Sequence, residues 1–494
     1  MAWITVAAAT ASVRTTSGTF DETLYLDLAR RAFAEGGTRS FADLGVAPLP
    51  VMIAWDHLAV APVALPASDA TAYVGRVTRA RSNAIWWFAV PLVVGSLLWL
   101  TLRHGVAAVV ACLAALTAFM ESQTAVRGAL LAMALGLALA TKYSAPGMFL
   151  SAAVAMWIDR RTRRKRYDLL VLVSGLVVAW AADGFATAPL AESGGRFTQA
   201  AAALGAGAGW AGEWLASLPS PLWIRSLAAQ LYLEREGQEA FLLGQRSTLG
   251  WWYYFPVAIV LKSTPVELAA LAAFAAWSVR HWRTDVETRV WAITAAVFAV
   301  LPLASHRNLG VRYVLPVVIM AAIGSARWLG RMSESRRRLT VVAIVVAAQG
   351  ASFWSITPQY LAYFNTLAGG PANGYRRLVD SNLDWGQDLP RLAAWLGDHH
   401  TRRVRLAYFG TAPPSAYGID ALDYRADPDA RESPVWLALS VTHLQGVFIC
   451  GDPFEPFRPL VPDGRPGYSI MIYSVDRPEV SRGLRLAIQN TCDS

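Results

Sequence analysis

The sequence predicts an all-α polytopic membrane domain of about 10–11 transmembrane helices, followed by a C-terminal extracytoplasmic α/β domain. Of the 494 residues, 55% are hydrophobic and only 16% are charged. A soluble protein usually carries about a quarter charged residues, so much of this apolar surface is expected to face lipid. Short arginine-rich clusters separate the long apolar runs, and the runs stop near residue 357.

The apolar runs define the predicted membrane domain, residues 1–357. A spanning helix needs about 20 predominantly apolar residues, and several runs approach that length. They are residues 86–102, 106–120, 169–180, 251–277, 290–304, 311–329 and 339–354. A further apolar stretch, 127–160, is interrupted at Lys142, and residues 46–65 form a weaker candidate. Residues 2–13 are apolar over only about half a span, which suggests a truncated first helix.

The basic loops set the expected orientation. Lys and Arg outnumber Asp and Glu by 44 − 35 = 9, and they cluster between apolar runs at 160–166, 280–289 and 331–338. Such loops face the cytoplasm in membrane proteins. The outer loops 14–48 and 187–250 and the domain 358–494 are then extracytoplasmic, as in a bacterial inner-membrane protein. The interleaving with apolar runs makes the bilayer the expected partner and argues against nucleic acid.

Residues 358–494 have the pattern of a soluble α/β domain. Segments 404–409, 435–440 and 468–473 are rich in β-branched and aromatic residues and predict strands, and 386–396 predicts an amphipathic helix. Cys450 and Cys492 can pair if this domain faces an oxidising compartment. Cys112 lies in an apolar run and is expected to be a buried small hydrophobe.

Asp21 and Glu22 are adjacent carboxylates at the start of the first outer loop. Such a pair can supply a general base for an acceptor hydroxyl, or a metal ligand. The alternative is an acidic cap on the helical run 24–33, where the helix dipole favours negative charge, and the residues alone favour this cap. A divalent metal stays open as a cofactor, although no Cys/His spacing typical of a metal site is present.

Several cations stand where a membrane protein seldom places them. Lys142 and Lys262 fall within apolar stretches, where an ionisable residue usually serves a pathway or a ligand, or else extends to the interface. His306 and Arg312 belong to a cationic turn on the expected outer side. Arginine forks suit a phosphate, and contact with lipid headgroups is the alternative.

Two further motifs have open interpretations. Trp252 and Tyr254 belong to an aromatic group that is typical of a membrane interface, and they are also candidates for sugar or acceptor contacts. Asp380, Asp384 and Asp388 follow one another at intervals of four. This spacing suits either a divalent ion or a turn rich in side-chain-to-backbone hydrogen bonds, and the turn is favoured.

Four segments together resemble one family. They read GQRSTLGWWYYFP at 244–256, NLGVRYVLP at 308–316, PQYLAYFN at 358–365 and DSNLDWGQD at 380–388. The chain resembles bacterial members of the dolichyl-phosphate-mannose–protein mannosyltransferase-like family, glycosyltransferase family 39, within the membrane-embedded C-type fold. The match runs from about residue 21 to residue 473 and is densest from residue 244 onward.

The resemblance implies a hexosyltransferase. It would move a sugar, with mannose as the first candidate, from a polyprenyl-phosphate carrier to a protein, lipid or envelope acceptor, with inversion at the anomeric carbon. Asp21 corresponds to the catalytic base and Glu22 to its partner. The donor phosphate would be held by residues from four places in the chain, namely Lys142, Lys262, His306 and Arg312.

The chain departs from the family near its beginning. Relatives usually carry a His-Pro-Pro-Leu-like element in the first outer loop, and this chain reads Val-Ala-Pro-Leu-Pro at 46–50. A catalytically impaired paralogue that acts as a membrane scaffold is therefore an alternative. A transporter is a weaker one, because the sequence contains no internal repeat of the kind that transporters use.

Overall fold

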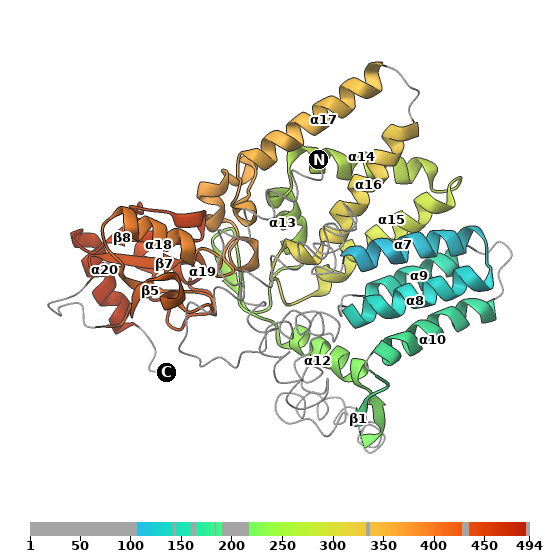
Figure 1. Ribbon diagram of the computed structural model, residues 1–494, viewed down its shortest axis with the longest axis horizontal. Helices are drawn as coiled ribbons and strands as arrows, with labels where there is room; N and C mark the ends of the chain where they lie inside the picture. Colours follow the sequence, from blue (N-terminus) through green and yellow to red (C-terminus); the bar gives the residue numbers. More distant parts are fainter. Residues whose placement is uncertain are drawn as a thin grey trace.

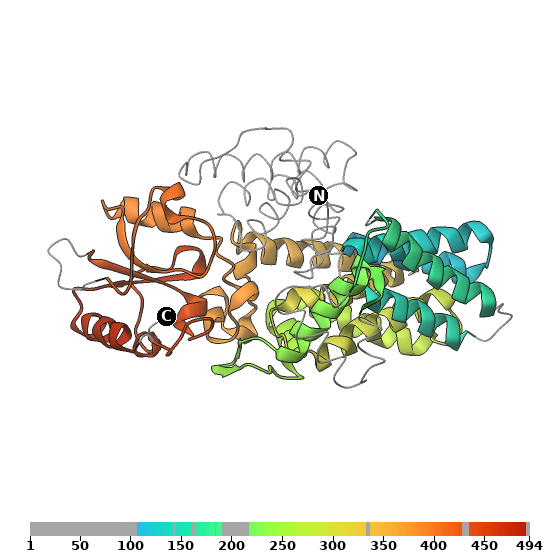
Figure 2. The same ribbon diagram turned by 90° about the horizontal axis from the view of Figure 1, so that it is seen from below.

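The computed structural model describes residues 106–141, 145–159, 165–182, 184–189, 217–331, 336–426 and 434–490. These residues form an elongated molecule with a helical half at one end and a small α/β domain at the other (Figure 1). Figure 2 shows the same two ends from a second direction.

The helical half is built from apolar helices that pack on one another. They are α7 (Val106–Glu121), α8 (Ala125–Thr141), α9 (Pro146–Ile158), α10 (Lys165–Ala182), α14 (Pro265–His281), α15 (Val286–Val300) and α16 (Leu315–Arg331). Leu116, Leu131, Leu135 and Met148 are fully buried where these helices meet. The helices bury apolar side chains against one another, so the apolar runs of the sequence supply a common core.

The expectation of about 10–11 transmembrane helices is wrong. In the part of the chain that the structure describes, a single helix, Val286–Ala304, is long and apolar enough to cross a membrane. Five other apolar helices are only 10–17 residues long, and a span needs about 20. The architecture is instead a mixture of packed helices and small sheets. The predicted span 86–102 and the predicted outer loop 14–48 lie outside the described residues.

The predicted span 251–277 shows why hydropathy misled. The run is divided into α13 (Tyr254–Lys262) and α14 by an extended Ser263 and Thr264. Thr264 caps α14 by accepting from the backbone N–H of Glu267, while the Glu267 carboxylate accepts from the N–H of Thr264. This reciprocal capping box starts a new helix within the apolar run.

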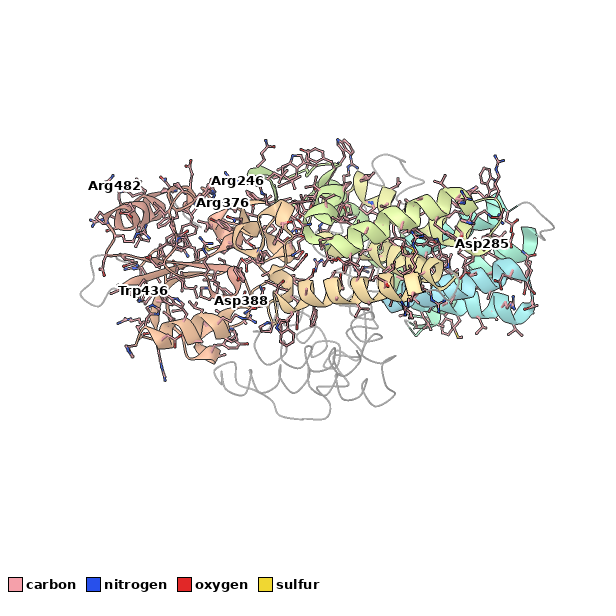
Figure 3. The ribbon with its side chains drawn as sticks, turned by 90° about the horizontal axis from the view of Figure 1, so that it is seen from above. Arg246, Asp285, Arg376, Asp388, Trp436 and Arg482 are labelled. Carbon is pink, nitrogen blue, oxygen red and sulfur yellow. The ribbon has the colours of Figure 1, made fainter. Side chains whose placement is uncertain are left out.

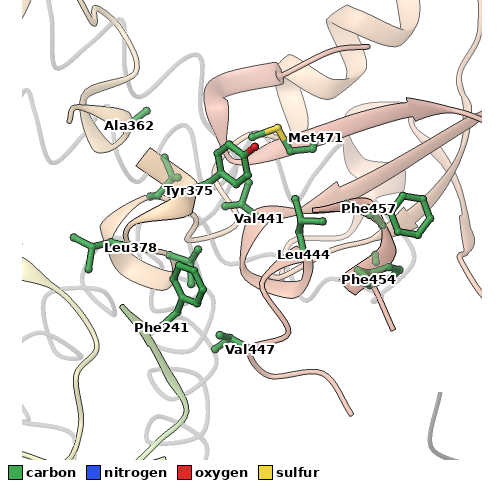
Figure 4. Packing of buried hydrophobic residues seen from close by; sticks show 14 of the residues in the cluster. Phe241, Ala362, Tyr375, Leu378, Val441, Leu444, Val447, Phe454, Phe457 and Met471 are labelled. Carbon is green, nitrogen blue, oxygen red and sulfur yellow. The ribbon is translucent and has the colours of Figure 1, made fainter. Parts of the chain in front are cut away.

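Two helices, α12 (Leu222–Glu236) and α17 (Arg336–Trp354), and several short elements connect the two halves. The short elements are β1 (Thr187–Pro189), β2 (Pro219–Pro221), β3 (Ala240–Leu242), β4 (Gln245–Ser247), η2 (Leu301–Ala304), η3 (Val311–Tyr313), η4 (Tyr360–Ala362), η5 (Thr366–Ala368), η6 (Pro371–Arg376) and η7 (Asp380–Asn382). Phe241 of β3 packs with Leu378 and with Val447 of the α/β domain in one buried cluster (Figure 4). The cluster is continuous from α13 to the sheet, so the connecting segment and the domain share a core.

The α/β domain contains one four-stranded sheet in the order β6-β5-β7-β8. Its strands are β5 (Arg403–Ala407), β6 (Asp420–Asp423), β7 (Trp436–Ser440) and β8 (Ile470–Ser474). Its helices are α18 (Leu389–Asp398), η8 (Pro414–Tyr417), α19 (Val441–Leu444), η9 (Glu455–Phe457), η10 (Pro466–Tyr468) and α20 (Pro478–Gln489). β5 pairs in parallel with β6 and β7, and β8 pairs antiparallel with β7. The three strands and the helix predicted from the sequence are confirmed within a few residues, whereas β6 and α20 were not predicted.

The two cysteines that the structure describes differ in their bonding. Cys112 is a free thiol that is fully buried in α7, as expected. Cys450 takes part in a disulfide bond. Cys492 lies outside the described residues.

Candidate functional site

Asn382 is fully buried and holds three parts of the chain together. Its side-chain amide donates to the hydroxyl of Tyr254 at 2.8 Å, and its side-chain oxygen accepts from the backbone N–H of Val311 at 2.9 Å. Its backbone carbonyl accepts from Nζ of Lys262 at 2.6 Å. Because Tyr254 and Lys262 are the first and last residues of α13, Asn382 fixes both ends of that helix and the start of η3.

Two further asparagines complete this junction. The side-chain amide of Asn365 donates to the carbonyls of Val260 and Ser263, at 2.5 and 2.9 Å, and so satisfies backbone groups at the end of α13. The side-chain oxygen of Asn308 accepts from the N–H of Trp251 at 2.6 Å. A Cβ at Gly250 would lie 2.1 Å from that same oxygen, so only glycine fits there.

Lys262 presents its ammonium at this junction. Its half-buried side chain donates to the carbonyls of Leu361, at 2.7 Å, and Asn382. Nζ also lies 4.2 Å from the ring centroid of Phe364. An ammonium has three N–H donors, so the two carbonyls leave a third. Burial lowers the pKa of Lys262 to about 7, because the charged form loses hydration.

A cleft of about 240 Å³ opens beside Lys262, between α13, α14, α16 and α17. Polar and apolar side chains both line it. The polar lining residues are Lys262, Ser263, Thr264, Glu267, Gln349, Ser352, Tyr360 and Tyr363. The apolar lining residues are Val311, Leu315, Val318, Phe353 and Ile356. A ligand that carries both a charged group and a hydrocarbon group matches this lining.

The carboxylate in the cleft is held in place by hydrogen bonds. Glu267 accepts from the N–H of Thr264 at 2.8 Å and from the side-chain amide of Gln349 at 3.4 Å. The hydroxyl of Thr264 in turn donates to Gln349 Oε1 at 2.8 Å. This network ties α14 to α17, so the polar wall of the cleft is rigid at that point.

Tyr360 leaves a buried polar atom on the cleft wall. Its ring stacks on Phe353 with centroids 4.7 Å apart. Its hydroxyl is buried and finds no hydrogen-bond partner within the described residues. Buried polar atoms without a partner are uncommon, but this hydroxyl has no accessible surface towards the cleft, so Tyr360 lines the cleft with its ring.

Arg312 and His306, which were expected to bind the phosphate together with Lys262, contact different residues. The guanidinium of Arg312 lies over the ring of Trp385 at 4.4 Å from its centroid. His306 is exposed and lies near Gly237, and the adjacent Arg307 donates to Gln238 Oε1. Arg312 follows Val311, a residue of the cleft wall, whereas neither Arg312 nor His306 is itself on the wall.

The remaining predicted residues divide into two groups. Asp21, Glu22 and Lys142 lie outside the described residues. Tyr254 is buried with 1% of its surface exposed, and burial raises its pKa, so it belongs to the framework around Asn382. Trp252 is 69% exposed and packs edge-on against Tyr253.

Of the three aspartates at intervals of four, Asp384 makes the side-chain-to-backbone hydrogen bonds that the favoured interpretation expects. Asp384 accepts from the backbone N–H groups of Thr442 and Gly386, and burial raises its pKa to about 7. Asp388 pairs with Arg391 and accepts from Ser469 at 2.6 Å, where the α/β domain meets the helices (Figure 3). Nowhere in the described ranges do three or more His, Cys, Asp or Glu side chains gather as a metal site would require.

Sequence reasoning missed several residues of the cleft. Glu267 could have been found, because Thr264 three residues before a Glu is the pattern of a capping box. Gln349 of the cleft, and Asn382 of the neighbouring junction, carry no such local signal, since their roles arise from contacts across about 80 residues or more of chain.

Comparison of the chain with protein-family models, with characterised proteins and with solved structures finds no match in any of the three.

Proposed function

We propose that this chain transfers a sugar from a polyprenyl-phosphate carrier to a protein, lipid or envelope acceptor, with inversion at the anomeric carbon. The supporting observation is the cleft beside Lys262, whose lining combines an ammonium with apolar side chains. The ammonium suits the donor phosphate, and the apolar side chains suit the adjoining prenyl chain. The donor and acceptor classes are those that the resemblance of the four sequence segments to family 39 glycosyltransferases implies.

The chemistry follows from charge. Sugar transfer from the donor breaks the bond between the anomeric carbon and a phosphate oxygen, so negative charge develops on the departing phosphate. A preorganised cation in a site with little water stabilises that charge most effectively. The two groups that accept from Lys262 are backbone carbonyls, which carry no net charge. Its third N–H can therefore be donated to the phosphate.

The acceptor side of the reaction is assigned by resemblance. Asp21 would remove the proton of the acceptor hydroxyl, and Glu22 would support it. The acceptor oxygen then attacks the anomeric carbon from the face opposite the phosphate, which inverts its configuration. Lys142, His306 and Arg312 remain proposed phosphate contacts.

The proposed setting is the outer face of a bacterial inner membrane. Large apolar side chains on α10 are exposed, among them Leu169 at 63% and Leu170 at 57%, and exposed apolar surface of this kind marks contact with lipid or a partner. The disulfide at Cys450 is typical of an oxidising compartment. This setting does not depend on the number of membrane spans.

The test is an assay of sugar transfer from a polyprenyl-phosphate sugar, with membranes that contain the full-length chain. Lys262→Met should lower the rate about 10²–10³-fold, which is the usual effect in other enzymes of removing one group that stabilises charge in the transition state. Asp21→Asn should lower it at least as much, since it removes the base. Arg280→Ala is the matched control, because Arg280 is exposed on α14, and it should keep the wild-type rate. Wild-type rates in both Lys262→Met and Asp21→Asn would exclude the proposed mechanism.

A further inference from the structure

The cleft beside Lys262 also contains a negative charge. Among the described residues that line the cleft, Lys262 and Glu267 have charged side chains and the others are neutral. The two charges come from neighbouring helices, since Lys262 ends α13 and Glu267 lies in the first turn of α14. A ligand in the cleft therefore meets one positive and one negative group.

The carboxylate of Glu267 lies at the cleft in a fixed position. It accepts from the backbone N–H of Thr264 and from the side-chain amide of Gln349, and both of these residues line the cleft. Tyr363 lines it too, and the pKa of Tyr363 is raised first by burial and further by the charge of Glu267. The negative charge is thus close to several parts of the lining.

The two charges do not neutralise each other in an ion pair within the described part of the chain. The ammonium of Lys262 donates to backbone carbonyls, and the carboxylate of Glu267 accepts from neutral N–H groups. The chain between them is short, because Thr264, which binds the carboxylate, is two residues beyond Lys262 and successive Cα atoms are about 3.8 Å apart. Both charges therefore act on any group that is bound in the cleft.

This arrangement distinguishes ligands by their charge. A second negative charge on a ligand is attracted to Lys262, but its repulsion from Glu267 offsets that attraction. Transfer of a doubly charged group out of water also costs more than transfer of a singly charged one. The cleft therefore gives a doubly charged ligand no electrostatic advantage, whereas Lys262 alone would give it one.

We propose that Glu267 is a specificity-determining residue, which makes the cleft favour a singly charged phosphodiester over a doubly charged phosphate monoester. The identity of the two ligands rests on the proposed function. Sugar transfer breaks the bond from the anomeric carbon to a phosphate oxygen, that oxygen stays on phosphorus, and the acceptor proton passes to the base. The singly charged diester thus becomes a monoester with about two charges near pH 7.5. Repulsion by Glu267 would promote the release of this product.

The test compares two probes with the same hydrocarbon, geranyl phosphate and its methyl ester, by calorimetry at pH 7.5 with the purified full-length chain. The wild type should bind the methyl ester at least as tightly as the monoester. Two unit charges about 10 Å apart, at an effective dielectric constant of about 20, interact strongly enough to change an affinity about tenfold. Glu267→Gln should therefore raise the affinity about tenfold for the methyl ester and about a hundredfold for the monoester.

The variant carries little risk to folding. Gln keeps an oxygen that can accept from the N–H of Thr264, and a capping box uses Gln as well as Glu at this position. Glu455→Gln is the matched control, because Glu455 is exposed on η9 in the α/β domain, and it should bind both probes as the wild type does.

The outcomes separate this inference from the proposed function. Binding of both probes with the same affinity ratio in the wild type and in Glu267→Gln would overturn the selection by charge and leave the donor site in place. A wild type that prefers the monoester more than tenfold would overturn it as well. Failure of both probes to bind saturably would overturn this inference together with the proposed donor site. A shifted ratio supports the inference even if the transfer assay fails, since no sugar is transferred here.

Discussion

At the scale of single residues, Asn382 shows how one buried side chain can organise a site. It has no exposed surface, and its amide meets Tyr254 and Val311 from different elements. Burying an amide without partners would cost about 1–3 kcal/mol per group, so each of these bonds is strongly favoured in the folded chain. The backbone carbonyl of the same residue fixes Lys262. The position of the ammonium therefore depends on a residue 120 positions away.

Lys262 gives a prediction about pH. Its pKa in the free chain is about 7, and an anionic ligand should raise that pKa by favouring the charged form. Binding of a prenyl phosphodiester, whose own charge is constant above pH 4, should then weaken by up to about tenfold per pH unit above pH 7. Lys262→Arg should remove this dependence, because a guanidinium stays charged. Calorimetry at pH 6, 7, 8 and 9 measures the affinity for the phosphodiester. Equal wild-type affinities across this series would contradict the prediction.

At the scale of elements, the break between α13 and α14 shows what hydropathy cannot reveal. Residues 251–277 are apolar enough to suggest one span, yet Thr264 and Glu267 start a new helix in their middle. The strands of the α/β domain were easier to predict from the sequence, because short β-branched segments between turns are a local signal. β6 was missed because its four residues, Asp420–Asp423, include two aspartates and carry no such pattern. Local chemistry thus predicted β5, β7 and β8, whereas the cleft depends on distant contacts.

The cap of α14 provides a second prediction. Thr264→Ala removes the acceptor for the N–H of Glu267 and the donor to Gln349. The loss of a helix cap costs about 0.5–2 kcal/mol, and the lost link to α17 adds to it. Denaturant titration should show a lower unfolding midpoint, and donor affinity should fall because the cleft wall loosens. Thr264→Ser keeps the hydroxyl and serves as the control. An equally low midpoint in Thr264→Ser would show that the lost stability comes from packing of the methyl group and not from the cap.

At the scale of the whole molecule, the helical half and the α/β domain share a buried cluster. Phe255 of α13 and Tyr473 of β8 are both about 1% exposed within it. Arg246 adds a link at the edge, where it donates to the carbonyl of Gly446 and pairs with Asp452 at 2.9 Å. The two halves therefore unfold together in our expectation, and groups buried on either side of their junction should both influence one transition.

Asp384 and Lys262 should act on that transition in opposite directions. Burial raises the pKa of Asp384 from 3.8 to about 7, so the folded chain holds more protons than the unfolded chain between these values. Stability from this group is present below pH 3.8 and is lost as the pH rises towards 7. Asp388, whose pKa burial also raises, acts in the same direction. The pKa of Lys262 falls from 10.5 to about 7, so the unfolded chain holds more protons above pH 7 and stability rises there.

These two groups together predict a minimum in the free energy of unfolding near pH 7. Asp384→Asn keeps an acceptor for the N–H of Thr442 and should flatten the falling limb between pH 4 and 7, leaving the rising limb unchanged. Lys262→Met should flatten only the rising limb between pH 7 and 10. Denaturant midpoints at pH 5, 7 and 9 distinguish the two, since each variant is the control for the other. A wild-type midpoint with no minimum near pH 7 would contradict this combined prediction.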